Sequence, residues 1–126
     1  MSTQPITVLV VEDEEIISKA LQTKLEKNNF SIHVAREGEA GLAMAASAKP
    51  DVILVDLLMP RVSGFEFLRR LKENSELKSI PAIVLTNLDD TSYQKKAMDL
   101  GAAEYLVKTR TNLDELKNKI HEYAKR

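Results

Sequence analysis

The sequence contains no cysteine, so it can form no disulfide, no thiolate zinc site and no cysteine nucleophile. Its apolar runs are short, and none approaches the roughly 20 residues that are needed to span a bilayer. The N-terminus has no charged segment followed by a long apolar stretch, so no signal peptide is predicted. These absences favour a cytoplasmic chain without membrane insertion.

An excess of charge of one sign is also lacking. The 18 basic and 19 acidic side chains give a net charge of −1, which offers no whole-domain basis for binding nucleic acid. The length of 126 residues, with 44% hydrophobic and 29% charged residues, is typical of one globular domain. We therefore expect a single domain over residues 1–126. Residues 1–5 are expected to form a flexible tail, and no domain is expected after the last helix.

Five short apolar runs predict strands, and three of them (VLVV, VILV and AIVL) are apolar throughout. Such continuous runs are typical of parallel strands that are covered by helices on both faces. The predicted strands are Ile6–Val11, Ile32–Ala35, Val52–Val55, Ala82–Leu85 and Tyr105–Val107. The segments between them have helical spacing. Strand and helix alternate five times, which predicts a doubly wound α/β fold with a parallel sheet.

The helical segments carry apolar stripes and clear stop signals. The stripes are Ile17, Leu21 and Leu25; Leu42, Ala45 and Ala46; Phe65, Leu68 and Leu71; Ala97, Met98 and Leu100; and Leu113, Leu116, Ile120 and Ala124. Asn28–Asn29, Lys49–Pro50 and Gly101 are expected to end the first, second and fourth helices.

Chemically active side chains follow four of the five strands. Glu12 and Asp13 follow the first strand, Asp56 the third, Thr86 the fourth and Lys108 the fifth. The carboxyl ends of parallel strands meet at one edge of a sheet, where ligands bind. Three carboxylates at one place repel each other unless a cation is present. Oxygen ligands without histidine or cysteine point to Mg²⁺ or a similar ion.

Asp56 is the candidate nucleophile of this cluster. An aspartate can attack phosphorus and form an acyl phosphate. A metal ion and the Lys108 ammonium would neutralise the charge on the transferring group, and the Thr86 hydroxyl could donate a hydrogen bond to it.

These residues lie in motifs that resemble the receiver domains of response regulators. The motifs are VLVVEDE with Glu12 and Asp13, VILVDLLMP with Asp56 and Pro60, then Gly64, VLTN with Thr86, and EYLVK with Tyr105 and Lys108. The resemblance runs from about Ile6 to the last helix. It implies a flavodoxin-like fold with strand order 2-1-3-4-5.

The resemblance implies a phosphoacceptor of a two-component system or phosphorelay. Asp56 would take a phosphoryl group from a sensor histidine kinase or a histidine phosphotransfer protein. Asp13, Asp56 and the backbone carbonyl of Leu58 would bind Mg²⁺ directly, and Glu12 would act through a metal-bound water.

The resemblance also implies a switch. Lys108 would pair with the phosphate, Thr86 would move towards it, and Tyr105 would rotate inward. The face built from the fourth helix, fifth strand and fifth helix would then bind a downstream protein target. The chain is expected to be a monomer or a phosphorylation-dependent dimer.

One position departs from the family's pattern. The lysine is commonly followed by proline, in a cis peptide that aims it, but Thr109 follows Lys108 here. Because a cis bond before a residue other than proline costs roughly 3 kcal/mol, the loop is expected to be either trans or cis under strain.

Each candidate also has an ordinary structural explanation. Asp13 could cap the first helix, and Thr86 could cap the fourth. Asp56 could belong to an ordinary loop, Lys108 to the solvated surface, and Tyr105 to half-buried packing. The presence of all these residues at strand ends favours a functional site.

Two other functions compete with the phosphoacceptor. A phosphatase with an aspartyl nucleophile would need a second acid two residues later, where this chain has Leu58. A phosphate-independent, receiver-like interaction module would not need the whole set of Glu12, Asp13, Asp56, Thr86 and Lys108. We therefore expect no enzyme beyond one that catalyses its own phosphorylation and dephosphorylation.

Overall fold

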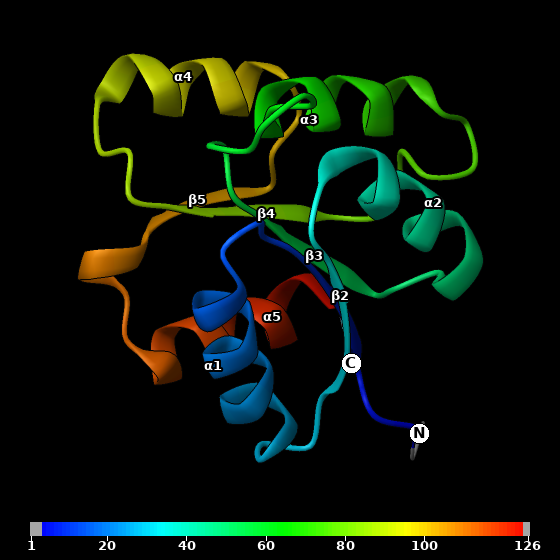
Figure 1. Cartoon of the computed structure of the whole chain (residues 1–126), viewed down its shortest axis with the longest axis vertical. Coiled ribbons are helices and arrows are strands. Elements are labelled where there is room, and N and C mark those ends of the chain that lie inside the picture. The colour runs from blue at the N-terminus through cyan, green and yellow to red at the C-terminus, as the bar shows by residue number, and fades with distance from the viewer. Residues whose placement is uncertain (1–3, 125–126) are drawn as a thin grey trace.

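Strands and helices alternate along the chain in the structure, a computed structural model that describes residues 4–124 (Figure 1). The strands are β1 (Thr7–Val11), β2 (Ser31–Ala35), β3 (Val52–Val55), β4 (Ala82–Thr86) and β5 (Glu104–Val107). The helices are α1 (Glu15–Glu26), α2 (Gly38–Ala48), α3 (Gly64–Glu73), α4 (Thr91–Asp99) and α5 (Leu113–Ala124). A short 3₁₀ turn, η1 (Lys108–Arg110), follows β5.

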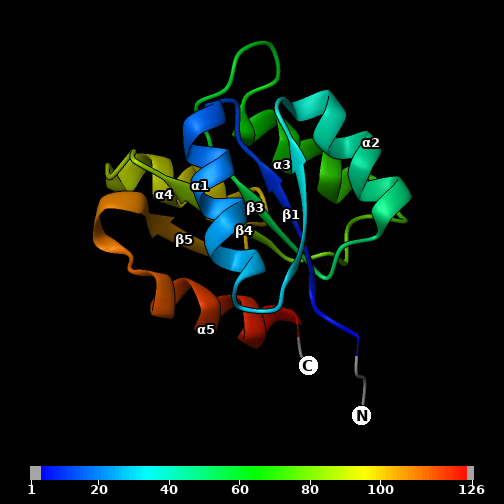
Figure 2. The same cartoon turned by 60° about the horizontal axis from the view of Figure 1, so that its bottom comes forward.

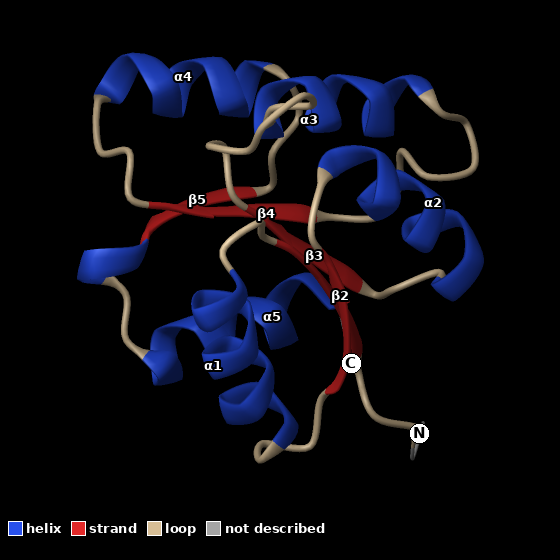
Figure 3. Ribbon diagram, in the orientation of Figure 1, coloured by secondary structure: helices blue, strands red, loops and turns tan. Residues whose placement is uncertain are grey.

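The strands form one parallel sheet in the order β2-β1-β3-β4-β5, which confirms the predicted fold class and strand order. Helices lie on both sides of this sheet (Figure 3). Side chains that alternate along each strand therefore enter two different cores. This is why β1, β3 and β4 are apolar at consecutive positions rather than at every second one.

The two cores lie on opposite faces of the sheet. On the face covered by α2, α3 and α4, the core includes Leu9, Val11, Ile53, Val55, Phe67, Leu68, Leu71 and Val84. On the face covered by α1 and α5, it includes Val8, Val10, Leu25, Leu54, Ile83, Leu116 and Ile120. The chain thus forms three layers, with the strands in the middle.

The predicted boundaries agree with the structure to within one residue at each strand end. Helices α1, α2 and α4 end close to the stop signals, and Asn29, Lys49 and Gly101 have positive φ angles.

On α3 the prediction missed Phe67, which is fully buried, whereas Phe65 is only partly buried. The η1 turn was not predicted. Of the tail expected at residues 1–5, residues 1–3 lie outside the described part, and residues 4 and 5 are exposed.

The loops that follow β1, β2 and β3 gather at one end of the sheet (Figure 2). All strands run in the same direction, so their carboxyl ends lie together there, as the sequence predicted. Across residues 4–124, no helix combines the length and the apolar character that crossing a membrane requires.

Candidate functional site

The register of the sheet brings the candidate side chains together. Val11 pairs with Val55, so Glu12 and Asp56 leave the sheet side by side. On the other side of β3, Thr86 pairs with Val107, which places Lys108 next along β5. The site is therefore a direct consequence of parallel strands whose ends are aligned, with polar residues at or just after those ends.

Glu12, Asp13 and Asp56 form an acidic cluster in which one carboxylate oxygen of each residue lies within 4.8 Å of the others. Glu12 and Asp56 are buried, and Asp13 is partly exposed. Burial is the main reason that the pKa of Glu12 is raised above its usual value, and Lys108 offsets this effect only in part. The predicted proximity of the three acids is thus present in the structure.

Lys108 joins two of these acids. Its Nζ atom lies 3.1 Å from Asp56 Oδ2, and it also donates a hydrogen bond to Glu12 Oε1. Burial alone would lower the pKa of the Lys108 ammonium, but the carboxylates of Glu12 and Asp56 outweigh that effect and raise it. Only 15% of its side chain is exposed, which excludes the solvated-surface explanation.

The substitution of Thr109 for the usual proline does not move Lys108 out of the site. No cis peptide bond occurs within residues 4–124, so the bond between Lys108 and Thr109 is trans. Lys108 then begins the η1 turn, and Thr111 Oγ1 donates a hydrogen bond of 2.9 Å to the Val107 carbonyl. Of the two conformations expected for this loop, the structure has the trans one.

Thr86 is the last residue of β4 and is fully buried. Its hydroxyl donates a hydrogen bond of 2.7 Å to Asp56 Oδ1. The cap of α4 is Asp90, whose carboxylate accepts from the Ser92 amide, so Thr86 does not cap that helix. Asp13 is likewise not the cap of α1, because Glu14 occupies that position.

Tyr105 is connected to Asp56 through a chain of hydrogen bonds. The Leu88 amide donates to Thr86 Oγ1 at 3.4 Å, and the Tyr105 hydroxyl donates to the Leu88 carbonyl at 2.6 Å. Burial, with a smaller contribution from the charge of Asp89, raises the pKa of Tyr105 above its usual value. The carbonyl of Leu88 was not predicted as a partner, because no side-chain pattern marks it.

The loop after β3 also contacts the Asp56 carboxylate. The Leu58 amide donates to Asp56 Oδ1 at 3.2 Å, and the Gly64 amide donates to the Leu57 carbonyl at 3.0 Å. The Leu58 side chain is 58% exposed at the rim of the site. The role of the Leu58 carbonyl as a metal ligand stays a prediction.

Arg36, in the loop after β2, touches the site and was missed by the sequence analysis. Its Nη2 and Nε atoms donate to the main-chain carbonyl oxygen of Asp13 at 2.9 and 3.3 Å. Its Nη1 atom lies 3.4 Å from Glu15 Oε1. An arginine in a polar loop carries no signal of such a contact, since only the pairing of β1 with β2 brings the two loops together.

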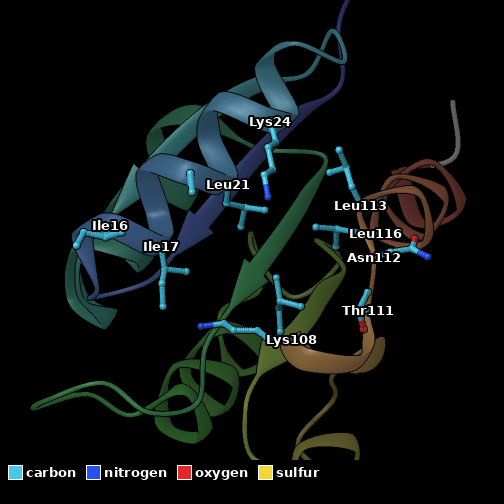
Figure 4. A pocket seen from close by; sticks show the side chains of 11 residues that line it. Ile16, Ile17, Leu21, Lys24, Lys108, Thr111, Asn112, Leu113 and Leu116 are labelled. Carbon is cyan, nitrogen blue, oxygen red and sulfur yellow. The ribbon is translucent and has the colours of Figure 1, made fainter.

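An apolar pocket of about 320 Å³ opens next to Lys108, between α1 and α5 (Figure 4). Ile17 and Leu21 line it from α1, and Leu113 and Leu116 line it from α5. Ile16, in the first turn of α1, is 85% exposed. An exposed apolar surface therefore adjoins the buried charged site.

The donor set fits a hard divalent cation. Three carboxylate oxygens within 4.8 Å of one another provide the oxygen ligands that Mg²⁺ and Mn²⁺ prefer, and no sulfur or imidazole ligand lies among them. The two oxygens of Asp56 also accept from other side chains: Oδ1 accepts from the Thr86 hydroxyl, and Oδ2 accepts from the Lys108 ammonium. That arrangement suits the binding of an anionic group next to a carboxylate nucleophile.

Comparison with known proteins identifies the family. The model of the response regulator receiver domain matches residues 8–121. The response regulator MprA of Mycolicibacterium vanbaalenii is 35% identical over 104 residues, which are 82% of this chain and 44% of that protein. This chain therefore spans less than half the length of that relative.

Solved structures agree with the sequence comparison. A response regulator from Chloroflexus aurantiacus superposes with a TM-score of 0.89 and 26% identity, covering 97% of this chain and 99% of that one. The Mn²⁺-bound form of the response regulator Rcp1 gives a TM-score of 0.76 and 30% identity, covering 94% and 91%. With its sheet, its acidic cluster and a matching model over most of its length, the chain belongs to the response regulator receiver domains, the signalling domains of two-component systems.

Proposed function

We propose that this domain accepts a phosphoryl group on Asp56 and that the phosphorylated state is its signal. The observation that carries this proposal is the environment of the Asp56 carboxylate. Thr86 donates to one of its oxygens at 2.7 Å, and Lys108 lies 3.1 Å from the other. With the Leu58 amide, three donors contact this buried carboxylate, and two further acids lie beside it.

The phosphoryl donor is proposed to be a phosphohistidine of a sensor histidine kinase or of a histidine phosphotransfer protein. An Asp56 oxygen forms the new bond to phosphorus while the phosphorus–nitrogen bond of the donor breaks. The departing imidazole keeps the electron pair of that bond and is protonated. Lys108 and Thr86 then face the oxygens of the transferred group, where charge is concentrated.

Glu12, Asp13 and Asp56 are proposed to hold Mg²⁺, with the Leu58 carbonyl as a further ligand. The bound ion supplies positive charge that offsets the repulsion between the carboxylate and the incoming phosphoryl group. The Mn²⁺ in the related Rcp1 supports the choice of a hard divalent ion.

The hydrogen-bond chain from Asp56 to Tyr105 is proposed as the path of the switch. A phosphoryl group on Asp56 would compete for the Thr86 hydroxyl, and Leu88 and Tyr105 would follow through their bonds to it. Tyr105 lies on β5, which contacts α4, and Tyr123 of α5 donates a hydrogen bond to Glu104 of the same strand. The surface formed by α4, β5 and α5 would therefore carry the change to a downstream protein.

The donor protein is proposed to contact the α1 side of the site. The exposed Ile16 side chain and the apolar pocket between α1 and α5 adjoin Lys108 there. We expect Ile16→Glu to slow phosphorylation by a phosphorylated histidine phosphotransfer protein. The same variant should react normally with acetyl phosphate, which needs no protein contact.

Intact-mass spectrometry after incubation with acetyl phosphate tests the phosphoacceptor directly. Wild type should gain one phosphoryl group in Mg²⁺ and none in EDTA, and Asp56→Asn should gain none in either. Because a short-lived acyl phosphate can escape detection, beryllofluoride with Mg²⁺ is added in parallel and followed by nuclear magnetic resonance. No adduct together with no spectral change would leave a phosphate-independent interaction module as the function.

A further inference from the structure

We infer that Arg36 is a positioning residue for the metal site: it holds the main chain of Asp13, and thereby the Asp13 carboxylate, in the geometry that binds a divalent cation. This inference rests on the proposed Mg²⁺ site. Arg36 contacts the main chain of Asp13, and within residues 4–124 none of its hydrogen bonds is with the carboxylates of Glu12, Asp13 or Asp56.

The loop that carries Asp13 has few ties of its own. Helix α1 begins after Glu14, and no side-chain hydrogen bond caps that end. The Glu14 amide donates to Glu12 Oε2 at 3.3 Å, which fixes Glu12 rather than Asp13. The two hydrogen bonds from Arg36 to the Asp13 carbonyl, at 2.9 and 3.3 Å, hold the peptide that follows Asp13.

Arg36 is itself held in place by the sheet. Ala35 pairs with Val11, and the Glu12 amide donates to the Ala35 carbonyl at 3.0 Å. The two loops therefore leave adjacent strands side by side, in the region that Figure 2 shows at one end of the sheet. The planar guanidinium can direct two N–H groups at one carbonyl while a third faces Glu15, which a lysine ammonium cannot do with the same geometry.

The neighbouring residue Glu37 ties the same loop to the loop after β3. Its carboxylate lies 3.3 Å from Arg61 Nη2, and Arg61 follows Pro60 in the segment that begins at Asp56. The loop after β2 thus bridges the two loops that supply the acidic ligands. Only the Arg36 half of this bridge reaches the main chain of a ligand residue.

Charge and positioning make opposite predictions for Arg36. A positive side chain near the acidic cluster opposes a divalent cation, so its removal should tighten Mg²⁺ binding if charge alone matters. If Arg36 positions Asp13, its removal should weaken binding, because outer partners of metal ligands typically change affinity by 10–100-fold. The sign of the change therefore separates the two roles.

The test is a titration of the apo chain with MgCl₂, followed by nuclear magnetic resonance, on wild type and three variants. Arg36→Met removes charge and hydrogen bonds and should raise the Kd by about ten-fold, at the lower end of that range because the side chain is 49% exposed. Arg36→Lys retains the charge and should restore part of the affinity. Arg61→Met removes an equal charge from the neighbouring loop and should leave the Kd unchanged or lower it.

Thermal unfolding without Mg²⁺ provides the second measurement. All three variants should unfold within a few degrees of wild type, because the exchanged side chains are at the surface. An unchanged or lower Kd for Arg36→Met would overturn the inference while leaving the Mg²⁺ site intact. A wild-type chain that shows no Mg²⁺ binding would contradict the site itself, and the inference with it.

Discussion

Helices α3 and α4 lie next to each other on the same face of the sheet, yet the structure holds them very differently (Figure 1). Helix α3 buries Gly64, Phe67, Leu68 and Leu71, whereas α4 buries Ala97 alone. Their contact at the surface is made by Phe65, whose ring lies 6.2 Å from that of Tyr93 and 4.4 Å from Lys96 Nζ. One helix is anchored in the core and the other rests on it.

This difference matches the roles proposed for the two sides of the site. Gly64, at the N-terminus of α3, lies close to the backbone of Asp56, so α3 would keep the proposed phosphoacceptor in place. Helix α4 follows Thr86 and Leu88, the residues through which the switch would act. Elements with few buried contacts open and shift at low cost, which suits a region that changes with the signal.

The largest expected effect is the loss of stability when a buried side chain of α3, rather than an exposed one of α4, is truncated. Phe67→Ala should lower the free energy of unfolding by about 3–5 kcal/mol, because it leaves a cavity against α2 and the sheet. Tyr93→Ala on α4 should cost about 1 kcal/mol or less, since Tyr93 is 41% exposed. Urea denaturation measures both. Similar losses for the two variants would remove the distinction between the helices.

Gly64 is the residue of α3 that lies nearest to the backbone of Asp56, the proposed phosphoacceptor. A Cβ atom there would lie 2.6 Å from Leu57 Cα and closer still to the Asp56 carbonyl oxygen. Gly64→Ala should therefore cost about 1–3 kcal/mol and slow phosphorylation by acetyl phosphate roughly ten-fold or more, because Asp56 is displaced.

Ser63→Ala is the matched control for Gly64→Ala. It removes the N-cap bond from the Glu66 amide to Ser63 Oγ, 3.2 Å long, without intruding on Asp56. It should cost about 1 kcal/mol of stability and leave the phosphorylation rate unchanged. A normal rate in Gly64→Ala would show that α3 does not position Asp56.

The caps of the two helices sharpen the comparison further. Ser63 caps α3, and Asp90 caps α4 by accepting from the Ser92 amide at 2.8 Å. Loss of the Ser63 cap should appear in global stability. Loss of the Asp90 cap, in Asp90→Ala, should appear as faster hydrogen exchange within α4 with little change in global unfolding. Equal global losses would mean that α4 unfolds only with the whole domain.

The smallest expected effect is a difference in acid response. Hydrogen bonds from Arg69, and then from Arg70, lower the pKa of Glu66 on α3 to about 2. A pKa lowered by folding stabilises the fold fully above the usual value of 4.5, and this contribution disappears as the pH falls towards 2. Carbon-13 nuclear magnetic resonance should find the Glu66 carboxylate titrating near pH 2. Titration near 4.5 would show that the arginines do not hold it.

Hydrogen bonds from Ser92 likewise lower the pKa of Asp90, so the same sign applies to the cap of α4. Its stabilising effect is complete above the usual value of 3.8 and is lost as the pH falls below it. Exchange within α4 should therefore accelerate below about pH 4 in wild type. In Asp90→Ala that acceleration should be absent.

Most of the fold followed from patterns that depend on neighbouring residues only. The apolar runs of β1, β3 and β4 predicted buried parallel strands, and the polar residue after each predicted the site. Strand order came from the resemblance to the family, because periodicity contains no information about which strands are neighbours. Phe67 was not predicted because the apolar stripe of α3 was taken to begin at Phe65, which lies two residues earlier and is only partly buried.

The parts of the site that were missed depend on contacts between distant segments. Arg36 and Asp13 are 23 positions apart, and Leu88 contacts Tyr105 through a main-chain atom. Neither contact leaves a mark in local composition. The trans bond after Lys108 was one of two conformations that the sequence allowed, and only the structure distinguishes them.

The acidic cluster has a consequence for the energetics of folding. With its three carboxylates ionised, and Lys108 as its ammonium partner, the cluster holds two uncompensated negative charges in a largely buried place. The charge of Asp56 contributes to the raised pKa of Glu12 for this reason. A divalent cation at this site would balance the charge that Lys108 leaves uncompensated. Binding of the proposed cation would link folding to the ion concentration around the protein.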